Sequence, residues 1–352
     1  MKTTKTLITL LAGALLGSAA YGQVEVTITG STAFRAITID RSASLYDGPS
    51  RTAITNDAAT GLITFSGTMS NSVPSLGATP VKIRLSFSGS ASGMLAVKNQ
   101  TPVSTADTQG GNITKVPDLA LSDVFPESAT PSILRSVFDR DVLGVIPFLW
   151  VKNSAMAGVN NVTRDQALLL MTASGGMPAT YLGGTSPDPI YLIGRDSGSG
   201  TRISVEKDIG FVGSPLLWGT DGSGNYIING GYSSGGLERA VIAAKADAIG
   251  YLGRADFAAI ATSATALTYD GVAYSSANVY NGSYALWGYE HIVNRVGGLS
   301  QNQTLVRNAL KAAIKNPTFQ STNPLYTASF ETLSGMSVER SADGGVITSI
   351  VF

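Results

Sequence analysis

Residues 195–202, Arg-Asp-Ser-Gly-Ser-Gly-Thr-Arg, combine permanent positive charge with hydroxyl groups and glycines. A guanidinium can donate to two oxygens of one oxyanion, hydroxyl groups add donors that rotate to fit, and glycine lets the backbone approach a ligand. The stretch could be a flexible linker, a turn with a nucleophilic serine, or a loop that wraps an anion. A strand-like run at 189–194 and a helix-like segment at 203–210 argue against the linker.

The nucleophile interpretation lacks a partner. A catalytic serine needs a base, usually a histidine held by a carboxylate. His291, the one histidine, lies in an apolar, strand-like run, where a satisfied structural imidazole is the favoured interpretation. A lysine base stays formally open. The absence of cysteine removes thiolate nucleophiles, disulfides and Cys-ligated metals. We therefore expect no catalytic residues, no metal and no organic cofactor.

Three further loops share the chemistry of residues 195–202. Gly30-Ser31-Thr32-Ala33, Gly89-Ser90-Ala91-Ser92 and Ser122-Asp123 each follow a strand-like run. Three of the four loops lead toward a plausible helix start. Ligands of open α/β sheets bind at the carboxyl ends of strands, and helix N-termini offer free N–H groups to oxyanions. Each loop alone is more typical of a turn or a cap, and the combination predicts an anion site.

The intervening segments alternate between strand and helix patterns. Residues 142–151 are typical of a buried strand, Thr163 and Gln166 have the spacing of a capping box, and residues 300–316 carry a helical apolar stripe. This alternation predicts an α/β fold with largely parallel sheets. Residues 41–80 are rich in Ser, Thr, Gly and Asn, and we expect a surface excursion with a hairpin through 62–67.

The N-terminus has the layout of a secretory signal peptide. Lys2 and Lys5 precede an apolar run at 7–16, which predicts a signal peptide over residues 1–22; a buried helix is the alternative. Without a cysteine there is no lipid attachment, so we expect a periplasmic or secreted protein. The net charge is zero and no basic stripe is present, so nucleic acid is not an expected partner.

The order of these motifs resembles the phosphate-binding proteins of bacterial ABC uptake systems, which have the two-lobed type II substrate-binding fold. The resemblance rests on Ile-Thr-Gly-Ser-Thr-Ala-Phe (28–34), Ser-Gly-Ser-Ala-Ser-Gly-Met (88–94), Ala-Leu-Ser-Asp-Val-Phe (120–125) and the Arg-x-x-Gly-Ser-Gly-Thr motif at 195–201. Segments 248–257 and 284–293 are similar to late strands of the family, although Ala285 stands where proline is usual. The similarity spans most of the chain after residue 22.

The resemblance implies the site residues and the lobes. Thr32 and the N–H of Ala33 would be first-loop donors, with Ser31 as an alternative to Thr32, and Asp123 would accept a proton from phosphate. The remaining ligand-binding residues would be Ser90, Arg195, Ser199, Gly200 and Thr201. Asp196 is expected to orient the guanidinium. Residues 23–145 and 255–352 would form lobe I, and residues 146–254 would form lobe II.

The function implied is a monomeric receptor for inorganic phosphate that serves an ABC permease and its ATPase, for uptake or for sensing. Phosphate retains a proton near neutral pH and sulfate does not, so a buried Asp123 would accept a hydrogen bond from the first and repel the second. The alternatives are a receptor for another oxyanion, a secreted phosphatase-like enzyme, and a surface protein that kept the fold without the ligand.

Overall fold

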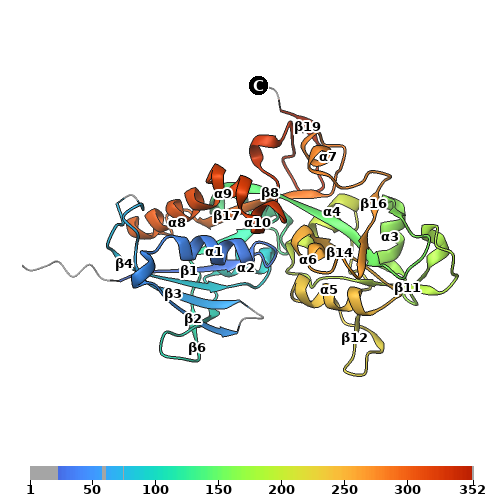
Figure 1. Ribbon diagram of the computed structural model, residues 1–352, viewed down its shortest axis with the longest axis horizontal. Helices are drawn as coiled ribbons and strands as arrows, with labels where there is room; N and C mark the ends of the chain where they lie inside the picture. Colours follow the sequence, from blue (N-terminus) through green and yellow to red (C-terminus); the bar gives the residue numbers. More distant parts are fainter. Residues whose placement is uncertain (1–22, 58–60, 74, 351–352) are drawn as a thin grey trace, which may run out of the picture.

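The computed structural model describes residues 23–57, 61–73 and 75–350, and the predicted signal peptide lies outside these residues. Within them, one mixed sheet runs through the molecule in the order β13-β12-β11-β14-β8-β17-β7-β1-β4-β3-β2. Helices flank it, and the strands gather into two lobes that lie side by side in Figure 1. This is the predicted α/β class with mixed sheets.

The first lobe contains the strands on the β17 side of β8. Apolar residues of its strands, such as Val26, Ile28 and Ile83, are fully buried, so the sheet forms the floor of the main core. Helices α1 and α8 pack on each other and α8 packs on β1. Its elements are β1 Val24–Gly30, α1 Arg35–Ser44, β2 Thr52–Asp57, β3 Leu62–Thr68, β4 Pro80–Ser86, α2 Ser90–Asn99, β5 Val103–Ala106, β6 Asn112–Lys115, β7 Leu119–Ser122, α7 Ser276–Tyr280, β17 Trp287–Arg295, α8 Gln301–Ile314, α9 Pro317–Thr322 and α10 Pro324–Thr327.

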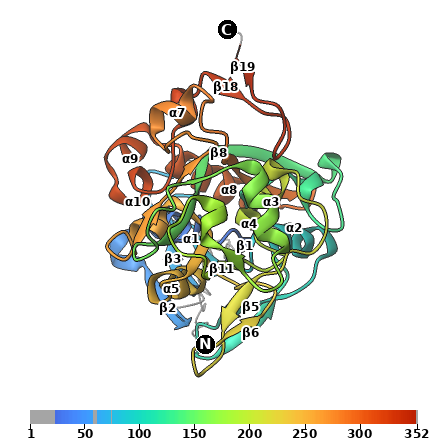
Figure 2. The same cartoon turned by 90° about the vertical axis from the view of Figure 1, so that its right-hand side faces the viewer.

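The second lobe contains the strands on the β14 side of β8. Helices α4 and α5 pack on β14, and α3 packs on β11. Figure 2 looks onto this lobe and shows α3 and α4 in front of the sheet. Its elements are β9 Asn161–Val162, α3 Arg164–Thr172, β10 Met177–Pro178, β11 Pro189–Ile193, α4 Gly200–Ile209, β12 Trp218–Thr220, β13 Tyr226–Ile228, α5 Gly235–Ala244, β14 Ala248–Gly253, α6 Arg254–Ala258, β15 Ala264–Ala266 and β16 Thr268–Tyr269.

Strand β8, Phe138–Asn153, belongs to both lobes. Its first part, up to Pro147, pairs antiparallel with β17, and its second part, from Phe148, pairs antiparallel with β14. It crosses from one lobe to the other in Figure 1. β15 also pairs with β8, and β16 pairs with β9. Residues up to Tyr269 therefore pair with second-lobe strands, which favours a lobe boundary later than residue 254; the boundaries themselves stay a prediction.

Several local predictions are confirmed and two are corrected. Thr163 and Gln166 form the predicted capping box at the start of α3. The hairpin through 62–67 is present as β2 and β3, but β3 also pairs with β4. Residues 41–80 therefore extend the sheet and are not merely a surface excursion. The sheet is also less parallel than predicted, because β8 and β17 run antiparallel to their neighbours.

The last segment of the described chain touches both lobes. The Arg340 guanidinium donates to the Ala285 carbonyl at 2.6 Å, and it lies over the Trp287 ring and 3.7 Å from Asp208 of α4. Asp343 accepts from the Phe125 N–H at 2.8 Å. Strand β18 (Val338–Glu339) pairs with β19 (Thr348–Ser349). The segment between them, residues 340–347, forms a C-terminal strap that contacts helix α4 through Arg340 and the loop after β7 through Asp343.

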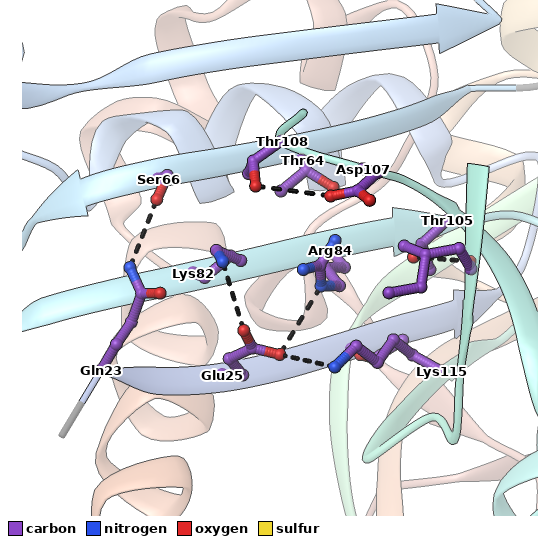
Figure 3. Close-up of polar contacts among 12 residues, drawn as sticks. Gln23, Glu25, Thr64, Ser66, Lys82, Arg84, Thr105, Asp107, Thr108 and Lys115 are labelled. Atoms are coloured by element: carbon purple, nitrogen blue, oxygen red, sulfur yellow. Dashed lines mark hydrogen bonds and ion pairs between the residues drawn. The ribbon is translucent and has the colours of Figure 1, made fainter. Parts of the chain in front are cut away.

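A single carboxylate fastens the β5–β6 hairpin over the first-lobe sheet. Figure 3 shows Glu25 of β1 among three cations. The Nζ of Lys82 lies 3.3 Å, the Nζ of Lys115 3.2 Å and the Nε of Arg84 3.7 Å from its oxygens. Arg84 is buried and also donates to the Ala106 carbonyl at 2.8 Å. Strands β1, β4, β5 and β6 are therefore joined by one ionic network.

We predict that Glu25→Gln lowers the free energy of unfolding by about 1 kcal/mol at neutral pH, a modest value because Glu25 is 36% exposed. Burial raises the pKa of Glu25, but Lys115 and Lys82 outweigh it and the pKa lies below its usual value. A lowered pKa stabilises the fold above the unfolded pKa of about 4.3, and this contribution is lost as the pH falls further. Urea unfolding should therefore show a larger difference between variant and parent at neutral pH than at about pH 3. The control is Glu339→Gln, at an exposed residue of β18, and a loss that is equal at both pH values would contradict the prediction.

Candidate functional site

The four predicted loops meet between the lobes. Strand β1 is parallel to β4 and β7, so the carboxyl ends of these three strands lie at the same edge. The loop after β11 reaches this edge from the second lobe. Gly30 has a φ of +110°, and a Cβ there would lie 2.1 Å from the Leu121 carbonyl oxygen, so only glycine fits this close passage of β1 and β7.

Asp123 lies at the centre of this arrangement. It follows β7, is 1% exposed, and accepts a hydrogen bond from the Ser90 hydroxyl at the start of α2 on Oδ1. Its own N–H donates to the Ser90 Oγ at 3.3 Å. A Cβ on Gly200 would lie 2.5 Å from the Ser90 Oγ and 2.7 Å from the Asp123 Cγ. The first turn of α4 therefore touches the first lobe directly, and its N-terminal N–H groups lie beside the carboxylate.

Arg195 enters the site from the second lobe with its side chain only 2% exposed. Its Nε donates to the Tyr232 carbonyl at 3.0 Å, and its Nη2 donates to the Ser233 carbonyl at 3.0 Å. The same Nη2 donates to the Thr32 Oγ1 of the first lobe, also at 3.0 Å. The two backbone carbonyls thus fix the orientation of the guanidinium, and its Nη2 makes a hydrogen bond across the interface between the lobes.

The residue expected to orient this guanidinium has another role. Asp196 accepts through Oδ1 from the Gly198 N–H at 3.1 Å, which closes the turn before α4, and its N–H donates to the Tyr232 carbonyl at 3.0 Å. The expectation was wrong because Tyr232 and Ser233 supply the orienting oxygens. Every residue carries a backbone carbonyl, so no sequence pattern could indicate these two partners.

The side chains of Ser31 and Thr32 point in different directions. Ser31 is fully buried, and its Oγ accepts from the Phe34 N–H at 3.2 Å at the entrance to α1. Thr32 is half-buried and its hydroxyl faces Arg195. The Thr32 hydroxyl therefore contacts Arg195 whereas the Ser31 hydroxyl holds the loop, and which of the two meets a ligand stays a prediction.

The structure brings the other predicted residues to the same place. Ser199 is the N-cap of α4 and accepts from the Arg202 N–H at 3.4 Å, and Thr201 follows on the first turn at 2% exposure. Ala33 faces Gly253: a Cβ added to Gly253 would lie 3.8 Å from the Cβ of Ala33. The Ala91 N–H donates to the Gly198 carbonyl at 3.1 Å across the interface. The lobes are closed on each other, and a ligand could enter only when they separate.

Two acids lie behind Arg195 in the second lobe. Glu238 is fully buried, and burial raises its pKa well above the usual value although the charge of Arg195 opposes this. Burial also raises the pKa of Asp256, against the opposing charges of Arg239 and Arg195. Burial thus favours the neutral form of Glu238, whereas Asp256 is paired with Arg239 at 2.8 Å, so neither acid is an ion-pair partner of Arg195.

Sequence analysis missed Glu290 on β17. It is fully buried, and burial followed by the charge of Asp123 raises its pKa well above the usual value. The neighbouring His291 is buried in β17 as predicted, packs 4.9 Å from the Phe125 ring, and has a pKa well below its usual value through burial. Its ring nitrogens have no hydrogen-bond partner among the described residues, so the predicted satisfied imidazole is buried but not satisfied there.

The described part of the chain contains neither a cluster of metal-binding side chains nor a membrane-spanning helix. No group of three or more His, Cys, Asp or Glu side chains there could hold a metal ion. Among residues 23–57, 61–73 and 75–350, no helix combines the length and the apolar character needed to cross a bilayer.

Comparison with solved structures establishes the fold. A candidate phosphate ABC transporter substrate-binding protein from Clostridium perfringens, solved with bound phosphate, is similar with a TM-score of 0.59 and 17% identity over 88% of this chain and 99% of the other. An ABC-type phosphate transport receptor from Vibrio cholerae has a TM-score of 0.54 and 17% identity over 85% and 98%. A candidate phosphate-binding protein from Planctomyces limnophilus has a TM-score of 0.50 and 15% identity over 89% and 94%. No protein-family model and no curated protein matches the chain.

These similarities cover nearly the whole length of each solved structure. The predicted two-lobed fold of the type II substrate-binding proteins is therefore confirmed. At identities of 15–17% they establish the fold alone.

We predict that Gly200→Ala prevents the lobes from closing. The added methyl would meet Ser90 and Asp123 well inside van der Waals distance, and relief requires the two lobes to move apart. Overpacking of this kind costs about 1–3 kcal/mol. Small-angle scattering should give a larger radius of gyration than that of the parent protein, with helix content unchanged. The control is Gly222→Ala, where a Cβ meets nothing within 4 Å. An unchanged radius together with unchanged stability would contradict the close contact of α4 with Ser90 and Asp123.

Proposed function

We propose that this chain is a receptor that binds inorganic phosphate between its lobes and hands it to an ABC permease with its ATPase. The carrying observation is a buried carboxylate, Asp123, which accepts from the Ser90 hydroxyl and lies beside the start of α4, while Arg195 reaches the first lobe at Thr32. An anion held by these donors must itself offer a proton to Asp123, and phosphate does. The printed descriptions of three similar structures name phosphate, which supports the same ligand.

The proposed contacts come from both lobes. The first lobe provides Thr32, the N–H of Ala33, Ser90 and Asp123, and the second lobe provides Arg195, Ser199, Gly200 and Thr201. In the closed arrangement Arg195 bonds to Thr32 and Ser90 bonds to Asp123, so a bound anion would exchange those bonds for its own. Exclusion of water strengthens each such bond, because the local dielectric falls. Binding would therefore favour closure, and closure is the signal that a permease can recognise.

The cellular setting follows from the same proposal. The similar proteins are described as parts of ABC transport systems, and a receptor of this kind works outside the cytoplasmic membrane. We propose a periplasmic, monomeric receptor without catalytic activity. Hydrolysis of phosphate esters by the purified chain would instead support the phosphatase-like alternative.

We predict that Asp123→Asn lowers the preference for phosphate over sulfate by roughly 10- to 100-fold, because an amide can donate to sulfate where a carboxylate repels it. Isothermal titration calorimetry of the phosphate-stripped chain from Gln23 onward measures both anions. The parent protein should show tight 1:1 phosphate binding and no sulfate response, and the variant should bind sulfate as well. The control is Asp165→Asn, an exposed aspartate in the first turn of α3. No heat and no thermal stabilisation with phosphate would refute this ligand, and molybdate or another oxyanion would then be titrated.

We predict that Arg195→Lys weakens phosphate and sulfate equally, by roughly 10- to 100-fold, and leaves their ratio unchanged. Lysine keeps the charge but loses the planar fork that contacts the Tyr232 and Ser233 carbonyls and the Thr32 hydroxyl. The same titrations measure it, with Arg51→Lys on the first-lobe surface as the control. A change confined to one of the two anions would contradict a role of Arg195 in general anion binding.

A further inference from the structure

Glu290 is a buried carboxyl group that the proposed contacts do not use. Its side chain has no exposed surface, and neither carboxyl oxygen has a hydrogen-bond partner among the described residues. In a folded core, an uncompensated carboxyl of this kind is costly and calls for a physical reason. The position of Glu290 relative to Asp123 provides one.

Strand geometry places Glu290 on the face of β17 that meets the anion site. Side chains two residues apart on a strand share a face, and Gly288 is two residues before Glu290. A Cβ on Gly288 would lie 2.8 Å from the Asp123 carbonyl oxygen, so this face of β17 packs against the loop after β7. His291 points the other way, toward Phe125. The register of β17 and β8 shifts between Glu290 and His291, which locally adjusts the direction of the side chain.

The protonation state of Glu290 follows from this environment. Burial raises its pKa well above the usual value, and the neighbouring charge of Asp123 raises it further. The Ser31 hydroxyl and the Ser122 N–H lower it only in part, and neither makes a hydrogen bond of ordinary geometry. Burial therefore favours the neutral form of Glu290, and a neutral carboxyl carries one O–H donor.

One more carboxyl group faces Asp123. Asp343 of the C-terminal strap is buried, and burial raises its pKa to about 6, with the charge of Asp123 adding to the rise and Arg340 opposing it. On the far face of β17, His291 is kept neutral by burial and by the nearby Arg140. Above about pH 6 Asp343 is mainly ionised, so Glu290 is the carboxyl group beside Asp123 whose neutral form burial favours.

We propose that Glu290 is a positioning residue for anion selectivity: it stays protonated behind Asp123 and directs its O–H to that carboxylate, which keeps Asp123 an acceptor. This inference rests on the proposed phosphate binding. A carboxylate that accepts hydrogen bonds from the Ser90 hydroxyl and from a protonated Glu290 is stabilised in its charged form. Sulfate, which brings no proton, is then excluded, because it could bind only after Asp123 had been protonated. Loss of the Glu290 O–H donor would raise the highest pH at which the site binds sulfate.

The test compares two replacements of similar size. Glu290→Gln keeps an N–H donor without charge, and Glu290→Met removes the donor while filling the space. Affinities for phosphate and for sulfate are measured by calorimetry in steps from about pH 6 to about pH 9. We expect the Met variant to bind sulfate at pH values about one unit higher than the parent does, which is a tenfold loss of discrimination at a given pH. The Gln variant should retain most of the discrimination.

The outcomes separate the inference from the proposed function. Parent protein that binds no phosphate refutes both. Parent protein that binds phosphate, with Met and Gln variants that exclude sulfate equally at every pH, overturns the role of Glu290 alone. A structural role for Glu290 would weaken both anions together and leave the pH dependence unmoved, and that result also overturns the inference.

A second measurement does not need the Met variant to fold. Infrared difference spectra of the parent protein at neutral pH should contain the C=O band of a protonated carboxylic acid that the Glu290→Gln variant lacks. Adding phosphate should shift that band, because the hydrogen bond between Glu290 and Asp123 changes when Asp123 accepts the phosphate proton. Buried Glu238 also has a raised pKa, and subtraction of the Gln spectrum removes its contribution. A spectrum without this band overturns the inference.

Discussion

The burial of one permanent positive charge organises the cleft. Arg195 cannot lose its proton, so its side chain, almost without solvent contact, has to meet oxygen atoms. The chain satisfies this need with the carbonyls of Tyr232 and Ser233, which precede α5, and with one hydroxyl of the opposite lobe. The loop before α5, the turn into α4 and the entrance to α1 are thereby held in a common arrangement.

The two lobes contribute opposite charges to this cleft. The second lobe brings the guanidinium of Arg195, and burial behind it favours the neutral form of Glu238. The first lobe brings the carboxylate of Asp123, with a second carboxyl, Glu290, behind it in the strand that pairs with β8. Each lobe alone would hold a poorly compensated charge, Arg195 in the second lobe and Asp123 in the first. Closure brings these opposite charges to the same interface, which stabilises the closed form.

Sequence patterns predicted the parts of this protein that depend on local chemistry. The capping box of Thr163 and Gln166, the glycine-hydroxyl loops and the alternation of strands and helices follow from residue type and spacing. Glu290 escaped because one acid in an apolar strand gives no signal until the packing of the strand is known. The carbonyl partners of Arg195 escaped for a similar reason, since any residue could supply them. The polar composition of 41–80 concealed strands that are held by backbone pairing at a sheet edge.

Strand β8 has a consequence for the order in which the chain folds. The first-lobe sheet needs β17, which lies well over a hundred residues after β8 begins, whereas the partners of β8 in the second lobe follow sooner in the sequence. Pairings that are distant in sequence form late, because a long loop must first be closed. During synthesis the second lobe can therefore assemble on the C-terminal half of β8 before β17 has been made to pair with its N-terminal half. The unpaired edge of β8 is then the surface of the nascent chain that most needs protection from aggregation.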